Sequence, residues 1–218
     1  MFIELVDALR CPHPHEESWL VLAATRIDAR HIREGALGCP VCRAEYPIRD
    51  GIADFRLGER RDEPELARSD RAEPASLDEV SADHLVALLG LGDAFGFVVL
   101  RGEWGTRALG LLHTSPMPPL LLVDPPDDVA MVPGLSGVRS GASLPLAAGA
   151  ARAVAVDATD AARLASAVHV TRAGGRIVAP AGAVVPEGVR ELARSDAVWV
   201  GEREAPPSAL VRLHVRRG

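Results

Sequence analysis

The chain is poor in cysteine and in aromatic residues, and both shortages reduce the number of functions that it could have. Its 218 residues include three cysteines, and 4% of them are aromatic. So few aromatic rings offer little platform on which nucleobases could stack. The net charge of −6 gives no general attraction to nucleic acid or to an anionic membrane surface. These features argue against a direct nucleic-acid partner.

Long apolar stretches are also missing. No segment reaches the roughly 18 uninterrupted apolar residues that a membrane-spanning helix needs. The first residues carry acidic side chains early and lack the apolar centre of a signal peptide. With every cysteine assigned to a metal site, none is left for a disulfide, which suits a reducing compartment. We therefore expect a cytoplasmic protein without a membrane partner.

All three cysteines fall near the start of the chain, and their spacing predicts a metal site. Cys39 and Cys42 form a Cys-x-x-Cys pair, and Cys11 and His15 can supply two more ligands. Zn²⁺ prefers four tetrahedral sulfur and nitrogen ligands, so this set predicts a structural zinc with no open position for substrate. His13 is an alternative to His15. We prefer His15 because Cys-x-x-x-His gives a longer, less strained reach than Cys-x-His.

Residues 1–57 have the pattern of short strands around two metal-binding knuckles. An apolar run at 19–24 reads as a strand, and the alternating segment 27–32 reads as its hairpin partner. Asp50-Gly51, flanked by apolar residues, is a hairpin turn signal. So short a unit buries little apolar surface, and metal binding must supply much of its folding free energy.

Residues 58–76 are charged and proline-bearing, which predicts a linker, and residues 77–218 form a second unit. Apolar runs alternate there with helical patterns, which predicts a parallel, doubly wound sheet. We expect strands at 97–100, 120–124, around Val138, at 153–157 and at 176–179. We expect helices from Ser76 as N-cap to Gly90 or Gly92, at 106–113, at 159–171 and, shorter, at 189–194. Two last strands, at 197–200 and 210–215, are expected to form an antiparallel hairpin.

Residues 1–57 resemble the zinc-ribbon family of activator subunits of tRNA and rRNA methyltransferases. The resemblance rests on Leu9-Arg10-Cys11-Pro12, on Cys39-Pro40-Val41-Cys42 and on the string Tyr46-Pro47-Ile48-Arg49-Asp50-Gly51-Ile52. The family usually has a second cysteine where this chain has Pro14. The resemblance thus implies a zinc ribbon in which a histidine replaces one thiolate.

The second unit, over residues 95–218, resembles class I S-adenosylmethionine-dependent methyltransferases. The resemblance implies an α/β fold with a Rossmann-like, mainly parallel, doubly wound sheet closed by a hairpin. In that family a glycine loop after the first strand approaches the methionine part of the cofactor, which Gly102 and Gly105 match here. An acid that ends the second strand holds the ribose, and Asp124 matches it. The resemblance therefore implies S-adenosylmethionine as a candidate cofactor held by these three residues.

The same segment departs from the family at the residues that would touch the cofactor. Leu100 and Arg101 stand where the first strand normally ends in an acid, and Ala142 stands where an acid would bind adenine. Trp104 interrupts the glycine loop, and we expect it to point inward and obstruct the pocket. Asp157 is expected to be a solvated or capping charge. No catalytic residue is identified.

Three functions compete on this basis. The first is a zinc-binding protein whose methyltransferase-like domain has lost cofactor binding and serves as an interaction or scaffolding module for another protein. Burial retains apolar strands, whereas only ligand binding retains the polar residues at their ends. The second is an active methyltransferase with an atypical cofactor pocket. The third, a nucleic-acid-binding module led by the ribbon, is opposed by the charge and the scarcity of aromatic residues.

Overall fold

The structure is a computed structural model that describes residues 1–56, 77, 79–92, 96–114 and 117–205. The predicted linker at 58–76, the N-cap at Ser76 and the strand at 210–215 lie outside these residues. No helix among the described residues is long and apolar enough to cross a membrane.

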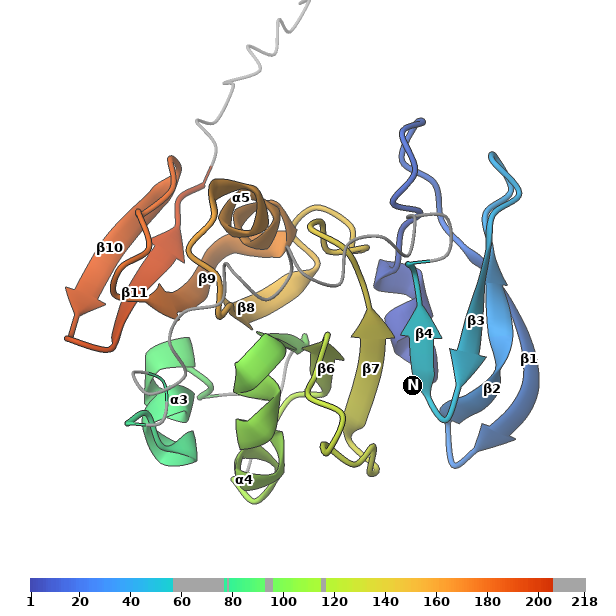
Figure 1. The fold of residues 1–218 in the computed structure, drawn as a ribbon, viewed down its shortest axis with the longest axis horizontal. Helices are drawn as coiled ribbons and strands as arrows, with labels where there is room; N and C mark the ends of the chain where they lie inside the picture. The colour runs from blue at the N-terminus through green and yellow to red at the C-terminus, as the bar shows by residue number, and fades with distance from the viewer. Residues whose placement is uncertain (57–76, 78, 93–95, 115–116, 206–218) are drawn as a thin grey trace, which may run out of the picture.

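Eleven strands of the described residues form one continuous sheet (Figure 1). In the spatial order from one edge to the other they are β1 (Val21–Asp28), β2 (His31–Gly38), β3 (Glu45–Arg49), β4 (Ile52–Asp54), β7 (Leu135–Arg139), β6 (Leu120–Val123), β5 (Val98–Arg101), β8 (Ala151–Ala155), β9 (Thr171–Pro180), β11 (Val198–Arg203) and β10 (Val189–Arg194).

The middle of this sheet is parallel and its two ends are antiparallel. From β4 through β7, β6, β5 and β8 to β9, each strand pairs in parallel with the next. At one end β11 runs antiparallel to β9 and β10 runs antiparallel to β11. At the other end β1 to β4 form an antiparallel meander. The predicted mainly parallel sheet is confirmed. The hairpin at its edge is formed by β10 and β11, whereas the predicted hairpin joined 197–200 to 210–215, and the second of these segments lies outside the described residues.

Helices cover both faces of the parallel strands, as the continuous apolar sequence of these strands requires. On one face lie α3 (Ala82–Leu89) and α4 (Ala108–Leu112), the latter preceded by the 3₁₀ helix η2 (Gly102–Arg107). On the other face lie α5 (Ala161–Val170) and the 3₁₀ helix η1 (Ile3–Ala8). Each face buries its own apolar cluster. The sheet is therefore doubly wound.

The N-terminal strands are joined directly to the parallel sheet. β4 pairs in parallel with β7, so that Ala53 lies opposite Val138. The backbone N–H of Phe2 donates to the Ser136 hydroxyl at 2.8 Å, and that of Arg10 donates to the Pro145 carbonyl at 2.9 Å. One apolar cluster contains side chains from both parts. The knuckles and the parallel strands thus share one core.

Local sequence signals account for several boundaries. Asp50 and Gly51 both have positive φ, at 49° and 83°, and connect β3 to β4 in the predicted hairpin. The Ser81 hydroxyl accepts from the backbone N–H of His84 and caps the start of α3, and Gly90, in the left-handed region, ends it. The predicted end of this helix at Gly90 is confirmed.

Three predicted elements are wrong. The helix expected from Ser76 to Gly90 is interrupted, because residues 79–81 are not helical and α3 begins only at Ala82. The hairpin partner of β1 begins at His31, because Ala29 and Arg30 take positive φ and form the turn, and Ile27 is still in β1. Residues 189–194 form strand β10 instead of a helix. Their composition suits a helix, but pairing with β11 satisfies the backbone of this edge strand, and the charged side chains point to solvent.

Candidate functional site

The four predicted metal ligands come together at one end of the ribbon. The ligand atoms of Cys11, His15, Cys39 and Cys42 all lie within 4.8 Å of one another. Cys11 and His15 come from the segment after η1, and the two other cysteines come from the turn between β2 and β3. That turn is closed by a hydrogen bond from the backbone N–H of Arg43 to the Cys39 carbonyl at 3.0 Å. The cluster that the spacing predicted is therefore formed.

The donor atoms fit a tetrahedral zinc ion. Around a tetrahedral Zn²⁺, two thiolate sulfurs lie about 3.8 Å apart, and a sulfur and an imidazole nitrogen about 3.6 Å apart. Here the sulfurs of Cys11 and Cys42 are 3.6 Å apart. His15 Nε2 lies 3.1 Å from the Cys11 sulfur and 3.4 Å from the Cys39 sulfur. Three sulfurs and one nitrogen in this arrangement could hold one zinc ion with no open position.

The second histidine lies at the rim of the cluster. His13 Nδ1 is 3.4 Å from the sulfur of Cys42, which is exposed. His15 contacts two of the three sulfurs. The geometry therefore favours His15 as the fourth ligand and places His13 beside it.

The protein surroundings act differently on the buried thiols. Burial is the largest cause of the raised pKa of Cys11, which reaches about 11. Burial also acts to raise the pKa of Cys39, but hydrogen bonds from the backbone N–H groups of Cys42 and Val41 lower it to about 6. Backbone donors at the Cys-x-x-Cys turn thus stabilise a thiolate before any metal binds.

A tyrosine lies directly behind the cluster. The hydroxyl of Tyr46 is 3.1 Å from the Cys11 sulfur, and the Tyr46 side chain is fully buried. Burial, followed by the contact with Cys11, raises the pKa of this hydroxyl far above its ordinary value, so it stays protonated. Nothing in the spacing of the sequence singled out this tyrosine as a neighbour of the metal site.

The second candidate site lies at the carboxyl ends of the parallel strands, where ligands of open α/β sheets bind. Asp124 directly follows β6 and takes a positive φ of 49°. Its Oδ1 accepts a hydrogen bond from the backbone N–H of Ser140 at 2.8 Å. Burial, the largest cause, raises the pKa of the Asp124 carboxyl. Its position at the strand end is the one from which a ribose could be held.

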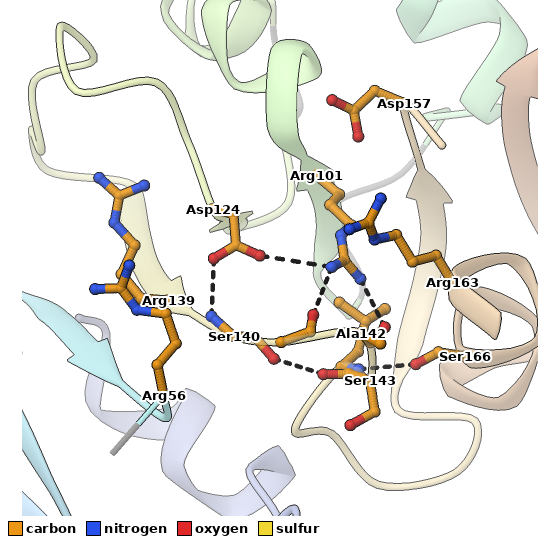
Figure 2. A network of polar contacts seen from close by, with 12 residues as sticks. Arg56, Arg101, Asp124, Arg139, Ser140, Ala142, Ser143, Asp157, Arg163 and Ser166 are labelled. Atoms are coloured by element: carbon orange, nitrogen blue, oxygen red, sulfur yellow. Dashed lines mark hydrogen bonds and ion pairs between the residues drawn. The ribbon is translucent and has the colours of Figure 1, made fainter. Parts of the chain in front are cut away.

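The other oxygen of Asp124 faces an arginine of the neighbouring strand. Arg101 ends β5, and its Nη2 lies 3.6 Å from Asp124 Oδ2 (Figure 2). The same guanidinium donates to the carbonyls of Gly141 at 2.6 Å and Ala142 at 3.0 Å. The Arg101 side chain is 6% exposed. A buried cation thus lies between the strand ends and the loop that follows β7.

The glycine loop is closed by an acid from the strand on its other side. Asp157, which follows β8, is 5% exposed, and its Oδ2 accepts from the backbone N–H of Glu103 at 3.0 Å. Gly102 has a φ of 60°, and a Cβ there would lie 1.9 Å from the same oxygen. Of the two roles expected for Asp157, the solvated one is wrong and the capping one fits, because its carboxylate accepts from a backbone N–H at the start of η2 and so links the end of β8 to the loop after β5.

The remaining loop residues also make contacts within the chain. A Cβ on Gly105 would meet the ring of Pro125 at 3.2 Å. Trp104 is 1% exposed and belongs to the apolar cluster on the α3 and α4 face, and its obstruction of a cofactor pocket stays a prediction. Its indole N–H has no hydrogen-bond partner among the described residues. The loop is packed into this part of the core.

Comparisons with known proteins give weak likenesses. No protein-family model matches the sequence, and no curated protein matches it significantly. A complex of the Haloferax volcanii Trm112 methyltransferase activator with a methyltransferase has 18% identity, covers 48% of this chain and 54% of that chain, and has a TM-score of 0.39. A geranyl diphosphate methyltransferase bound to its substrate and sinefungin has 14% identity, coverages of 45% and 43%, and a TM-score of 0.35.

A third structure is the T. thermophilus 16S rRNA methyltransferase RsmC with AdoMet and guanosine, at 20% identity, coverages of 58% and 40%, and a TM-score of 0.33. The matched part thus spans about half or less of each of these chains. The fold itself is described by the strand order, β7-β6-β5-β8-β9-β11-β10, with one antiparallel strand inserted next to the edge. This chain has a mixed α/β fold with a mainly parallel, doubly wound sheet, preceded by a segment with a candidate metal site.

Proposed function

We propose that this protein is a zinc-stabilised, methyltransferase-like protein that does not bind S-adenosylmethionine and acts as an interaction module for another protein. The observation that carries this proposal is the buried guanidinium of Arg101, which lies against Asp124 at the carboxyl edge of the sheet. A cofactor that is itself cationic gains from acids at this edge, and here an internal cation already pairs with the acid.

The contacts around the glycine loop support the same conclusion. In an open α/β sheet the binding crevice opens where neighbouring strands send their helices to opposite faces, which here is between β5 and β8. Asp157 bridges these two strand ends by accepting from the N–H of Glu103. Gly102 therefore has a structural reason to be glycine, namely the close approach of this carboxylate. Contacts within the chain are enough to account for the residue types at three positions, without a cofactor: Gly102, Gly105 and Asp124.

The proposed role of zinc is structural. Four ligands complete its coordination, so the ion would have no position for a substrate or for water. It would hold the segment after η1, whose residues 11–18 form no helix or strand, to the turn between β2 and β3. No chemical step is assigned to it.

The surface of the ribbon supports a protein partner. Among the described residues, five large apolar side chains are more than half exposed, and four of them lie between positions 19 and 41: Trp19, Val21, Ile27 and Val41. Exposed apolar side chains give a protein partner apolar area to cover, and these four all belong to the N-terminal segment. In this proposal the parallel sheet is the scaffold, and the N-terminal ribbon carries the surface that binds the partner.

Calorimetric titration of the full-length protein with S-adenosylmethionine and S-adenosylhomocysteine tests the proposal. We expect no heat of binding at millimolar ligand, while a known methyltransferase titrated in parallel gives a normal isotherm. Binding with a micromolar Kd that is abolished by Asp124→Ala would overturn the proposal. That result would favour the second candidate, an active enzyme with an atypical pocket, for which the position of Asp124 at the end of β6 is the supporting observation.

A further inference from the structure

The hydroxyl of Tyr46 occupies a special place beside the metal cluster. It lies 3.1 Å from the Cys11 sulfur, and that sulfur is the hydrogen-bond partner that the structure gives it. The Tyr46 side chain is 0% exposed, so the hydroxyl has no access to water. A buried hydroxyl without a partner is costly, and the tyrosine is therefore held to this sulfur.

The direction of this hydrogen bond follows from the chemistry of the metal site. A cysteine that binds zinc does so as a thiolate and carries no proton. The Tyr46 O–H must then be the donor and the Cys11 sulfur the acceptor. Donors to ligating atoms orient these atoms and adjust how much electron density they give to the metal.

Tyr46 also connects the metal cluster to the parallel sheet. Its ring lies against that of Phe55, with 4.6 Å between the centroids and an angle of 30° between the planes. The backbone N–H of Phe55 donates to the Arg139 carbonyl at 2.8 Å, at the end of β7. A continuous line of contacts thus runs from Cys11 to the strand that pairs with β4.

We infer that Tyr46 is a positioning residue of the metal site, which fixes the Cys11 thiolate through its hydroxyl and ties the knuckles to the junction of β4 and β7 through its ring. This inference rests on the structural zinc of the proposed function and is independent of whether S-adenosylmethionine binds. Its two parts use different atoms of one side chain, the hydroxyl oxygen and the ring, so they can be separated by substitution.

Full-length protein loaded with Co²⁺ in place of zinc provides the test. We expect Tyr46→Phe, which removes only the hydroxyl, to shift the sulfur-to-cobalt charge-transfer band to lower energy, because the thiolate loses a hydrogen-bond donor. We also expect the affinity for zinc, measured by competition with a chromophoric chelator, to fall by about 10-fold. The far-ultraviolet circular dichroism should stay unchanged.

The matched control is Phe55→Leu, which alters the ring contact and leaves the hydroxyl in place. We expect it to lower the melting temperature without moving the charge-transfer band. If the band energy and the zinc affinity of Tyr46→Phe equal those of the wild type, the inference is overturned while the metal site stands. If the wild type takes up no cobalt and no zinc, the metal site of the proposed function is overturned together with the inference.

A second measurement needs no variant and covers the case in which Tyr46→Phe does not fold. In wild-type protein loaded with cadmium-113, the hydroxyl proton of Tyr46 should exchange slowly and show a scalar coupling to the metal through the Cys11 sulfur. A hydroxyl proton that exchanges rapidly with water would contradict the inference.

Discussion

Arg101 and Asp124 face each other from the ends of two neighbouring parallel strands, with Nη2 of the arginine 3.6 Å from Oδ2 of the acid. The guanidinium also donates to two backbone carbonyls, of Gly141 and Ala142. Opposite charges that are withdrawn from water stabilise each other only as a pair, and removing one leaves the other buried and uncompensated. This pair is therefore a structural contact, and the proposed function rests on it as the feature that opposes a cationic ligand at this edge.

Replacing Arg101 should destabilise the protein strongly. Arg101→Met removes the cation that faces Asp124 Oδ2 and the donor to the carbonyls of Gly141 and Ala142, and we expect the free energy of unfolding in urea to fall by about 3–5 kcal/mol. The double variant Arg101→Met/Asp124→Asn should be destabilised by less than the sum of the two single variants, because the uncompensated charge is gone. Strictly additive effects of the two substitutions would contradict the pairing.

A side chain at Gly102 should break the bridge between β5 and β8. Gly102→Ala forces a left-handed backbone on alanine, at a cost of about 1–2 kcal/mol, and displaces the Asp157 carboxylate from the N–H of Glu103. The matched control is Gly182→Ala, where no atom lies within 4 Å of the added Cβ and no left-handed backbone is needed. Equal stability of the two variants in thermal melts would show that the bridge does not matter.

Loss of the metal should act mainly on the N-terminal part of the chain. We expect about one zinc per chain and, after removal with a strong chelator, faster hydrogen exchange in β1 to β3 than in β5 and β8. His15→Ala should weaken zinc binding more than His13→Ala, because His15 contacts two ligand sulfurs and His13 one. The opposite order would exchange the roles of the two histidines.

The ion pair between Asp54 and Arg56, beside the junction of β4 and β7, should make the stability of the protein depend on pH in the acid range. Hydrogen bonds from the Arg56 guanidinium, at 2.8 and 2.9 Å, lower the pKa of Asp54 below its ordinary value of 3.8. A lowered carboxyl pKa adds stability above the unfolded pKa, and this stability is lost as the pH falls through the folded pKa.

Asp54→Asn should therefore be less stable than the wild type at neutral pH, and the two should converge below about pH 3.8. Because the Arg56 side chain is 53% exposed, solvent screens the pair, and we expect a gap of only about 0.2–1 kcal/mol. Urea unfolding of both proteins across this range measures it. A gap that does not change with pH would remove the ion pair as its cause.

Much of the fold could be predicted from the sequence, because local patterns govern it. The apolar runs that became β5, β6 and β8 are buried on both faces, and such strands are readable without any partner. The Asp50-Gly51 turn follows from the backbone conformations that these two residues tolerate. The metal cluster was predictable for a similar reason, since ligand type and spacing alone nearly define a zinc knuckle.

The contacts that decide the second site could not be predicted, because they join residues far apart in the chain. The role of Arg101 depends on Asp124 and on the loop after β7, and that of Gly102 depends on Asp157. A glycine after a strand is equally compatible with a ligand or with a neighbouring carboxylate. The edge strand β10 was missed because pairing with β11 overrides its helical composition.

The pairing of β4 with β7 has a consequence for the tendency of the protein to aggregate. A parallel sheet that ended at β7 would expose a row of unpaired backbone N–H and carbonyl groups, which invites other chains to add on and leads to aggregation. The short strand of residues 52–54 covers this border, and an antiparallel meander carries the sheet beyond it. A chain that loses its metal would risk uncovering that border, so the zinc knuckles would guard the protein against self-association.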